Sequence, residues 1–299
     1  MATATKAAAP ARSLEVVGGR GSETRSRIMK YVSLAILVLL ALMTLYPFLY
    51  AIGTSFKSNA EAFASPLSLL PQAPTLEAYQ MLNTGLANVP RWTLNSALVA
   101  LIVTITRVLF DSIAGYALAR MHFAGRNIVF VAMLGTMMIP GVVLLIPRFI
   151  VLKQFGMLDS YWGLTFPFMV DVFGIFMMKQ FFESVPYELE EAAFVDGANR
   201  LDMFFRVVLP TAGPALAALA IFSFQGMWNN FMDVLVIVNS PDLYTLPLGL
   251  GLLRGSQGVN LPWNFIMAGS VLTTLPMALI FLFFQRYFVE GISYSGIKG

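Results

Sequence analysis

The sequence predicts an all-α membrane protein with six transmembrane helices and with both termini in the cytoplasm. Three observations carry this prediction. Hydrophobic residues make up 58% of the 299 residues and charged residues only 12%, whereas soluble domains average roughly 45–50% and about 25%. Six segments are mostly apolar over about 20 residues, the length that a helix needs to cross a bilayer. Finally, the Lys and Arg residues gather on one side of these segments.

Residues 1–28 precede the first apolar segment. They are rich in Ala, Gly, Ser, Thr and Arg and show no apolar periodicity, so they have no face to bury in a core. We expect a disordered cytoplasmic tail, followed by a membrane domain at 29–299 with its core at about 91–286. The apolar run after Lys30 is too long for a cleaved signal peptide, so the first span should stay attached.

The six apolar segments are expected to be helices, because a helix satisfies its backbone hydrogen bonds within the segment, where lipid offers no partner. An even number of spans places both termini on the same side of the membrane. In chain order the predicted spans are Tyr31–Phe56, Trp92–Leu118, Asn127–Ile146, Tyr161–Met178, Val207–Met232 and Trp263–Phe284.

The distribution of basic residues sets the orientation of these spans. With the N-terminus inside, one basic residue, Arg107, lies within a span, and the inner segments hold most of the others. The outer segments hold only Lys57, Arg91, Arg148, Lys153 and Arg254. Cytoplasmic loops carry an excess of Lys and Arg, so the termini and the loop after the fourth span are predicted to be cytoplasmic.

Two outer segments are longer than ordinary connections. Ser58–Arg91 contains an apolar stretch punctuated by proline, which suggests a surface along the membrane or against a partner. Asn239–Pro262 is interrupted by Gly and Pro. Long loops often carry function, but this loop could equally pack over the helix ends.

The inner loop at 183–210 is the most hydrophilic long stretch within the membrane domain. Pro186 suits the first turn of a short helix, and acidic residues near that helix N-terminus are favoured by the helix dipole. Leu189, Ala192 and Ala193 share one thin face, Gly197 ends the helix, and a second helix can follow Asn199. Such a unit could plug a groove on a cytoplasmic partner or be a solvated amphipathic connector.

The stretch EAAFVDGANRLDMFFRVVLP (191–210) resembles the EAA signature of ABC importer permeases. The signature is Glu-Ala-Ala, three residues, Gly, nine residues, an aliphatic residue, one residue and Leu-Pro. Val207 stands where isoleucine is usual, and the remaining positions match. YALARMHFAGR (116–126), FGIFMMKQFF (173–182) and the ending YFVEGISYSGIKG (287–299) are similar to the carbohydrate-importer group, specifically to subunits like the smaller maltose permease.

This resemblance implies a type I ABC importer permease fold in a prokaryotic cytoplasmic (inner) membrane. The loop would be the coupling helix that sits in a cleft of an ATPase subunit. Glu191 would pair with a basic group there, Ala192 and Ala193 would pack closely, and Gly197 would form the corner. The candidate coupling residues are Glu190, Glu191, Ala192, Ala193, Asp196 and Gly197.

The resemblance also implies the partners. They are a homologous, non-identical second permease subunit, two ATPase subunits that carry ATP and magnesium, and an extracytoplasmic solute-binding protein that meets Asn239–Pro262. A sugar or related polyol would be carried by alternating access. The chain itself has no G-x-x-x-x-G-K-[ST] loop, which ATP hydrolysis would need, so we expect no enzymatic activity and no cofactor in this chain.

Charged residues inside the predicted spans support a rival hypothesis, an ion-coupled secondary transporter that uses Asp111, Asp171 and Arg107. Such residues are costly in lipid and are functional candidates. Arg107 and Asp111 stand four residues apart and could simply pair with each other. Asp171 would then face a cavity, be protonated or reach Arg107. No inverted sequence repeat is evident, although many secondary transporters have one.

The end of the fifth span supplies candidates for the solute pathway. Gln225, Asn229 and Asp233 share a face at four-residue spacing, Asn230 lies beside them, and Trp228 offers a flat surface on which a sugar ring could stack. Together with Asp171 these are the pathway candidates. Hydrogen bonds between helices and an interfacial tryptophan are the structural alternative.

Composition excludes two other kinds of site. Cysteine is absent and His122 is the single histidine, so no set of His and Cys ligands for a metal is available. His122, next to basic residues in the loop at 121–126, is interpreted as a packing or interface residue. The net charge of +3 lies mostly beside the spans, which indicates membrane topology rather than a nucleic-acid surface.

Overall fold

The computed structural model describes residues 20–83, 88–256 and 262–296, and within them the side chains of residues 27–83, 88–253 and 262–285. All regular structure in the described residues is helical, which confirms the predicted all-α class. The chain divides into two units, one up to Tyr50 and one from Ala51 onward.

The described part of the first unit is the greater part of α1, Arg20–Ser55. The sequence from Arg27 to Ser55 is long and apolar enough to cross a membrane, in agreement with the first predicted span. Residues 1–19 of the predicted tail lie outside the described residues. Residues 20–28, assigned to the tail from sequence, form the first turns of α1 instead.

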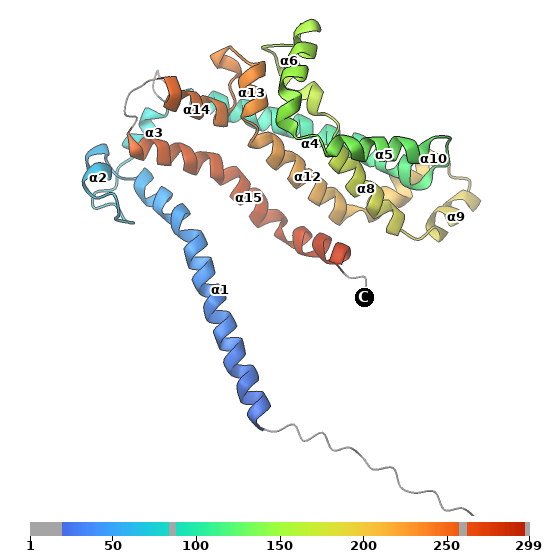
Figure 1. Ribbon diagram of the computed structural model, residues 1–299, viewed down its shortest axis with the longest axis horizontal. Coiled ribbons are helices and arrows are strands. Elements are labelled where there is room, and N and C mark those ends of the chain that lie inside the picture. The colour runs from blue at the N-terminus through green and yellow to red at the C-terminus, as the bar shows by residue number, and fades with distance from the viewer. Residues whose placement is uncertain (1–19, 84–87, 257–261, 297–299) are drawn as a thin grey trace, which may run out of the picture. The chain divides into compact units, whose positions relative to one another are not determined.

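The second unit begins with the end of α1 and holds the remaining elements (Figure 1). In chain order they are α2 (Asn59–Ala64), α3 (Glu77–Met81), α4 (Val89–Arg120), α5 (Arg126–Met137), η1 (Gly141–Leu144), α6 (Leu145–Gln154), α7 (Tyr161–Thr165), η2 (Phe166–Phe168), α8 (Val172–Ser184), α9 (Glu188–Val195), α10 (Arg200–Asp202), the π-helix η3 (Met203–Val208), α11 (Leu209–Thr211), α12 (Gly213–Trp228), α13 (Met232–Ile237), η4 (Pro241–Leu243), α14 (Leu246–Ser256) and α15 (Trp263–Gly296).

Four of the predicted spans correspond to continuous candidates: Arg27–Ser55, Val89–Arg120, Tyr161–Ser184 and Trp263–Gln285. The third and fifth are not single straight helices. The pair 126–137 and 141–154 is bent by 97°, and the pair 200–211 and 213–228 by 84°. Pro140 and Pro214 stand at these breaks, and proline removes a backbone donor and clashes with the preceding turn. Among the described residues the chain therefore has up to six spans, if each bent pair counts as one.

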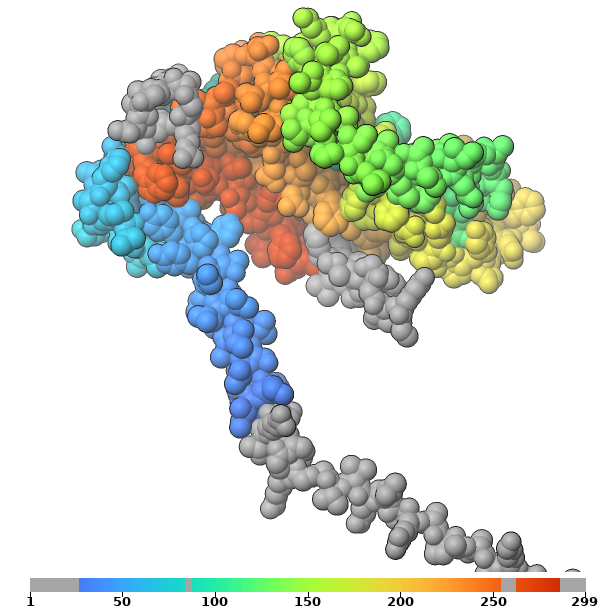
Figure 2. Space-filling model, in the orientation of Figure 1, coloured from blue at the N-terminus to red at the C-terminus, as the bar shows by residue number. Residues whose placement is uncertain are grey.

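Helix α4 is the central packing element of the second unit, with α8 and α12 as its main neighbours. The crossing of α4 and α8 depends on Gly115. A Cβ atom there would lie 2.8 Å from the Cβ of Met178 and 2.9 Å from the backbone nitrogen of Lys179. The absence of a side chain at Gly115 thus sets how closely α4 and α8 approach. Helix α5 contributes no buried residue and lies on the surface together with α6 (Figure 2).

A second cluster of close contacts holds the opposite end of α4. The ring of Trp92 packs on Gly249 of α14, where an added Cβ atom would lie 2.2 Å from Trp92 Cε3. Elsewhere in the second unit, the fully buried Lys57 donates to the carbonyl oxygens of Ser65 and Ser68, at 3.1 and 2.6 Å. Asn264 Nδ2 donates to the carbonyl of Lys57 at 3.0 Å, which ties α15 to the turn between α1 and α2.

Candidate functional site

The loop at 183–210 forms the helix, glycine corner and helix that the sequence predicts. Helix α9 ends before Gly197, whose φ of +86° is readily adopted only by residues without a Cβ atom. Asn199 then caps α10 through its Oδ1, which accepts from the backbone nitrogens of Leu201 and Asp202, both at 2.9 Å. The chain continues through the π-helix η3 and turns by 84° into α12. A π-helical segment is rare and is often found at functional sites.

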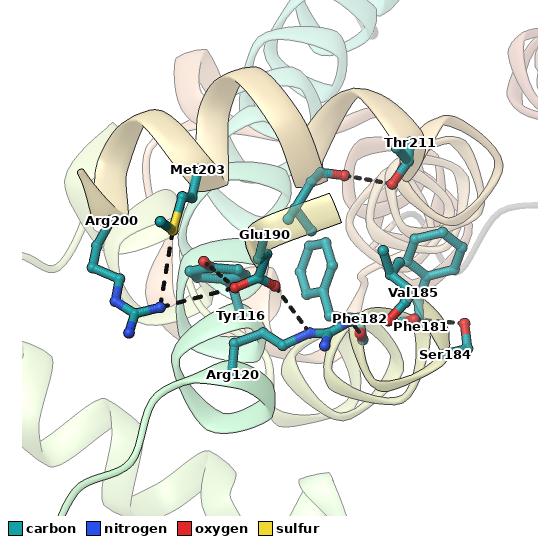
Figure 3. A network of polar contacts seen from close by, with 11 residues as sticks. Tyr116, Arg120, Phe181, Phe182, Ser184, Val185, Glu190, Arg200, Met203 and Thr211 are labelled. Carbon is teal, nitrogen blue, oxygen red and sulfur yellow. Dashed lines mark hydrogen bonds and ion pairs between the residues drawn. The ribbon is translucent and has the colours of Figure 1, made fainter. Parts of the chain in front are cut away.

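Glu190 is the buried residue of α9, and it lies at the centre of a polar network (Figure 3). Its carboxylate accepts a hydrogen bond from the Tyr116 hydroxyl at 3.2 Å. The same carboxylate lies 3.3 Å from Arg120 Nε and 3.9 Å from Arg200 Nη1. Tyr116 and Arg120 belong to α4, so the network joins the end of that long helix to α9.

Arg120 connects the network to a third helix. Its side chain is fully buried, and its Nη2 donates to the carbonyls of Phe182, at 2.5 Å, and Val185 at the end of α8. The last carbonyls of a helix have no partner within it, and a cation there satisfies them. The guanidinium also lies over the Tyr187 ring, 4.0 Å from its centroid, a cation–π arrangement.

The other candidate coupling residues lie on the outside of the same loop. Glu191, Ala192, Asp196 and Gly197 are exposed and Ala193 is half-buried. Phe194 and Val195 next to them are 70% and 84% exposed. The structure therefore separates Glu190 from this exposed set, although the sequence grouped it with Glu191.

Four residues of the network did not appear among the sequence candidates: Tyr116, Arg120, Tyr187 and Arg200. Tyr116 and Arg120 are distant from α9 in the sequence, and their contact with it depends on how α4 and α8 cross. The sequence offered one signal for this network, the basic residue Arg120 at the end of an apolar span. The excess of basic residues on the cytoplasmic side already explained its position, so no further role was assigned to it.

The charges inside α4 pair differently from the simplest prediction. The predicted i, i+4 pair between Arg107 and Asp111 is absent from the ion pairs of the described side chains. Instead Arg107 Nη1 lies 3.9 Å from Asp171 Oδ2, and Arg107 Nε donates to the carbonyl of Phe168 at 2.7 Å. Asp111 Oδ1 accepts from the backbone nitrogen of Asp171 at 3.0 Å. The helical hydrogen bonds are interrupted between η2 and α8, which leaves the carbonyl of Phe168 and the backbone nitrogen of Asp171 without helical partners. Arg107 and Asp111 of α4 pair with these two backbone groups instead of with each other.

The pathway candidates do not form one face, because α12 ends at Trp228 and α13 begins only at Met232. Gln225 and Asn229 are exposed. Trp228 is only 2% exposed. It stacks on Phe224 at 5.7 Å between ring centroids and donates from Nε1 to the carbonyl of Thr273 at 3.0 Å. Its ring is thus used in helix packing and offers no free surface for a sugar in this structure.

Asp233 and Asn230 belong to a polar contact between α13 and α6. Asp233 accepts from Arg148 of α6 and from Asn230 Nδ2 at 3.0 Å. Arg148 also lies over the Phe168 ring, 4.8 Å from its centroid. The two candidates therefore have partners within the chain, and Arg148 is a residue that the sequence did not single out here.

Part of the long segment 239–262 packs over the helix ends. Leu246 and Leu248 of α14 are fully buried, while residues 257–261 lie outside the described residues. The segment is joined to the turn before α7 by Asp159, whose carboxylate accepts from the backbone nitrogens of Asn239 and Ser240 at 2.9 and 2.8 Å and from the Ser240 hydroxyl. These hydrogen bonds, first among them that of the hydroxyl, lower the pKa of Asp159 below its ordinary value.

Comparison with known proteins links this arrangement to membrane transport. Residues 111–294, more than half of the chain, match the family model described as binding-protein-dependent transport system inner membrane component. The matched region includes the whole loop from 183 to 210.

Individual relatives extend the match over most of the chain. It is 35% identical over 262 residues to the arabinooligosaccharides transport system permease protein AraQ of Halalkalibacterium halodurans, covering 87% of this chain and 93% of AraQ. It is 32% identical over 279 residues to the trehalose/maltose transport system permease protein MalG of Thermococcus litoralis, covering 92% and 99%.

A solved structure gives the same result for the fold. It is the crystal structure of a bacterial ABC transporter involved in the import of the acidic polysaccharide alginate. The TM-score is 0.77 at 25% sequence identity, and the match covers 94% of this chain and 100% of the other.

Proposed function

This chain belongs to the family of binding-protein-dependent transport system inner membrane components, and on that basis we propose that it carries a carbohydrate across a prokaryotic cytoplasmic membrane. It is a multi-pass membrane protein and a permease component, and ATP hydrolysis belongs to a separate subunit of such importers. The proposed mechanism is alternating access: nucleotide closes the ATPase dimer, α9 moves with it, and the spans reorient around the solute.

The observation that carries the proposal is the exposed face of α9. Glu191 and Ala192 stand on it beside the strongly exposed Phe194 and Val195. An acidic residue among small and apolar ones suits a short helix that docks in a groove of a cytoplasmic protein. We propose that Glu191 pairs there with a basic group of the ATPase, that Ala192 and Ala193 allow close approach, and that Gly197 and Asp196 shape the corner.

The nature of the relatives supports a carbohydrate as the solute. The relatives are named as transport proteins for arabinooligosaccharides and for trehalose or maltose, and the solved structure is that of an alginate importer. We propose a sugar, an oligosaccharide or a related polyol for this chain. Exposed Gln225 and Asn229 and the half-buried Asp171 remain the pathway candidates that fit the geometry.

The proposed assembly has a homologous second permease subunit, two ATPase subunits with ATP and magnesium, and an extracytoplasmic binding protein. The segment 239–262 is the proposed contact for the binding protein. The ion-coupled alternative has less support, because Arg107 and Asp171 lie near each other and Asp111 accepts a backbone hydrogen bond. Each of these groups thereby has a structural role.

Energy dependence tests the function. Uptake of the sugar that co-purifies with the binding protein should persist in cells treated with an uncoupler and stop when ATP is depleted. Glu191→Lys should lower that uptake by about tenfold or more, since coupling free energies of 1–3 kcal/mol correspond to roughly 5–150-fold. Membrane insertion should survive.

The matched control is Glu188→Lys, which reverses an exposed charge on the same helix. It should leave uptake close to that of the wild type. Uptake that stops with the uncoupler alone would favour ion coupling, and normal uptake by the Glu191→Lys variant would contradict the docking role of Glu191.

A further inference from the structure

The proposed docking face leaves one charge of α9 unexplained. Glu190 is 6% exposed, so it faces away from any ATPase that meets Glu191. A buried carboxylate is costly unless it is paired and hydrogen-bonded. Its nearer partners are Arg120 and Tyr116, both on α4, and the exposed Arg200 of α10 lies farther away, at 3.9 Å; Figure 3 shows these side chains converging on it.

Among the described residues, the hydrophobic cluster at the end of α4 does not include α9. The hydrophobic cluster beneath the loop includes Tyr116, Met178, Phe182, Phe204 and Leu219, and no described residue of α9 is a member of it. The apolar side chains at the end of α9 point outward instead. The described side-chain connection from α9 to α4 is therefore the Glu190 network.

The geometry of that network is suited to transmitting a displacement. Apolar contacts are non-directional, whereas the Glu190 carboxylate is held by a buried ion pair to Arg120 on one oxygen and by a hydrogen bond from Tyr116 on the other, and a hydrogen bond has a preferred direction. Arg120 is itself immobilised, since it is fully buried and donates to the carbonyls at the end of α8. The pair between Arg206 and Asp202, whose side chains are 80% and 33% exposed, is by contrast a surface ion pair. Such pairs contribute little to stability.

We propose that Glu190 is a positioning residue that makes α9 and the end of α4 move as one body. The Arg120–Glu190 pair, assisted by the Tyr116 hydroxyl, passes the movement of the docked α9 helix to a membrane-spanning helix. This inference rests on the proposed function, because it requires that a nucleotide-driven subunit moves α9.

The test measures the distance between α4 and α9 in two nucleotide states of the assembled complex in nanodiscs. The chain contains no cysteine, so Met121→Cys and Glu188→Cys provide the only thiols of this subunit for spin labels, with any thiols of the partner subunits removed. Distances are recorded by electron–electron dipolar spectroscopy without nucleotide and after trapping with Mg-ATP and vanadate. Co-purification of the ATPase and hydrolysis of Mg-ATP report whether docking persists.

In the protein that carries only the two labelled cysteines, the α4–α9 distance should be the same with and without trapped nucleotide. With Glu190→Gln, which keeps the shape but removes the charge, trapping should shift that distance beyond the width of the wild-type distribution while docking and hydrolysis persist. Tyr116→Phe, which keeps the ring and removes only the hydroxyl, should give a smaller shift. A control, Glu183→Gln, removes the partner of Lys179 and should leave the distance unchanged.

Three results would overturn the proposal: no shift with Glu190→Gln, a shift already in the wild type, or loss of ATPase co-purification with Glu190→Gln, which would make Glu190 a docking residue. If the Glu190→Gln chain fails to insert, the Tyr116→Phe variant is judged by the same criteria. Failure of the proposed function is recognised separately, because the unchanged permease would then neither bind an ATPase nor respond to Mg-ATP.

Discussion

At the scale of single residues, position relative to the fold decides what a charge does. Glu190 and Glu191 are adjacent, yet one is buried against Arg120 and the other is exposed. Asp159 is a third case. Its φ of +53° lies in the left-handed region, which is uncommon except for Gly, Asn and Asp, and its carboxylate joins two segments that are distant in the sequence. Each of these acids is defined by its partners more than by its type.

The Asp159 contacts predict a pH-dependent stability. The folded-state pKa is lowered, so this contribution is present above the unfolded-state pKa of about 3.9 and is lost as the pH falls through the folded-state value. Asp159→Asn, which tolerates the same backbone conformation, should lower the thermal midpoint in detergent at pH 7. Below about pH 4 the difference from wild type should narrow.

Asp242→Asn is the control for this prediction. Asp242 is a strongly exposed aspartate whose distance to Arg91 is 3.9 Å, and such pairs contribute little. Its replacement should leave the midpoint nearly unchanged at both pH values. An Asp159→Asn deficit that stays as large well below pH 4 as it is at pH 7 would show that the charge is not responsible.

At the scale of elements, the crossing of α4 and α8 positions the site. It brings Arg120 to the end of α8 and, through α8, places α9 under Tyr116. Gly115 allows the close approach, and Gly174 lies against Asp111, where an added Cβ atom would come within 2.1 Å of Oδ2. Small residues at helix interfaces are typical of membrane proteins, in which packing rather than water drives helix association.

The crossing predicts that Gly115→Ala is destabilising. The new Cβ atom would meet a side chain and the backbone of α8 at less than 3 Å, and overpacking of this kind costs about 1–3 kcal/mol. We expect a lower thermal midpoint and a lower yield of assembled complex. The matched control is Gly135→Ala in α5, where nothing lies within 4 Å of the added atom, and its midpoint should equal that of the wild type. Equal midpoints for both variants would contradict the packing argument.

At the scale of the whole molecule, the distribution of basic residues predicts which side of the membrane each loop faces. This can be measured directly, because the native chain has no cysteine. Val195→Cys in the α9 loop, 84% exposed, and Leu67→Cys between α2 and α3, 85% exposed, should be labelled from opposite sides. In intact cells a membrane-impermeant maleimide should reach Leu67→Cys only.

Labelling after permeabilisation serves as the control, since both cysteines should then react. If Val195→Cys reacts in intact cells, the loop faces outward, and both the proposed docking and the inferred role of Glu190 would be untenable.

The sequence by itself determined the all-helical class, the four continuous spans and the helix–glycine–helix loop. These follow from local properties: a long apolar run can satisfy its backbone only as a helix, and Gly197 accepts a backbone angle that other residues resist. The family resemblance, too, was carried by a contiguous stretch, residues 191–210.

Only the tertiary structure decided which side chains meet. The burial of Trp228 and the pairing of Arg107 with Asp171 both depend on neighbours that are distant in the sequence. The same holds for Glu190, whose partners lie about seventy positions earlier on α4. The periodicity and spacing of residues predict which side chains share a helix face. Which element packs on that face is decided by how the helices cross.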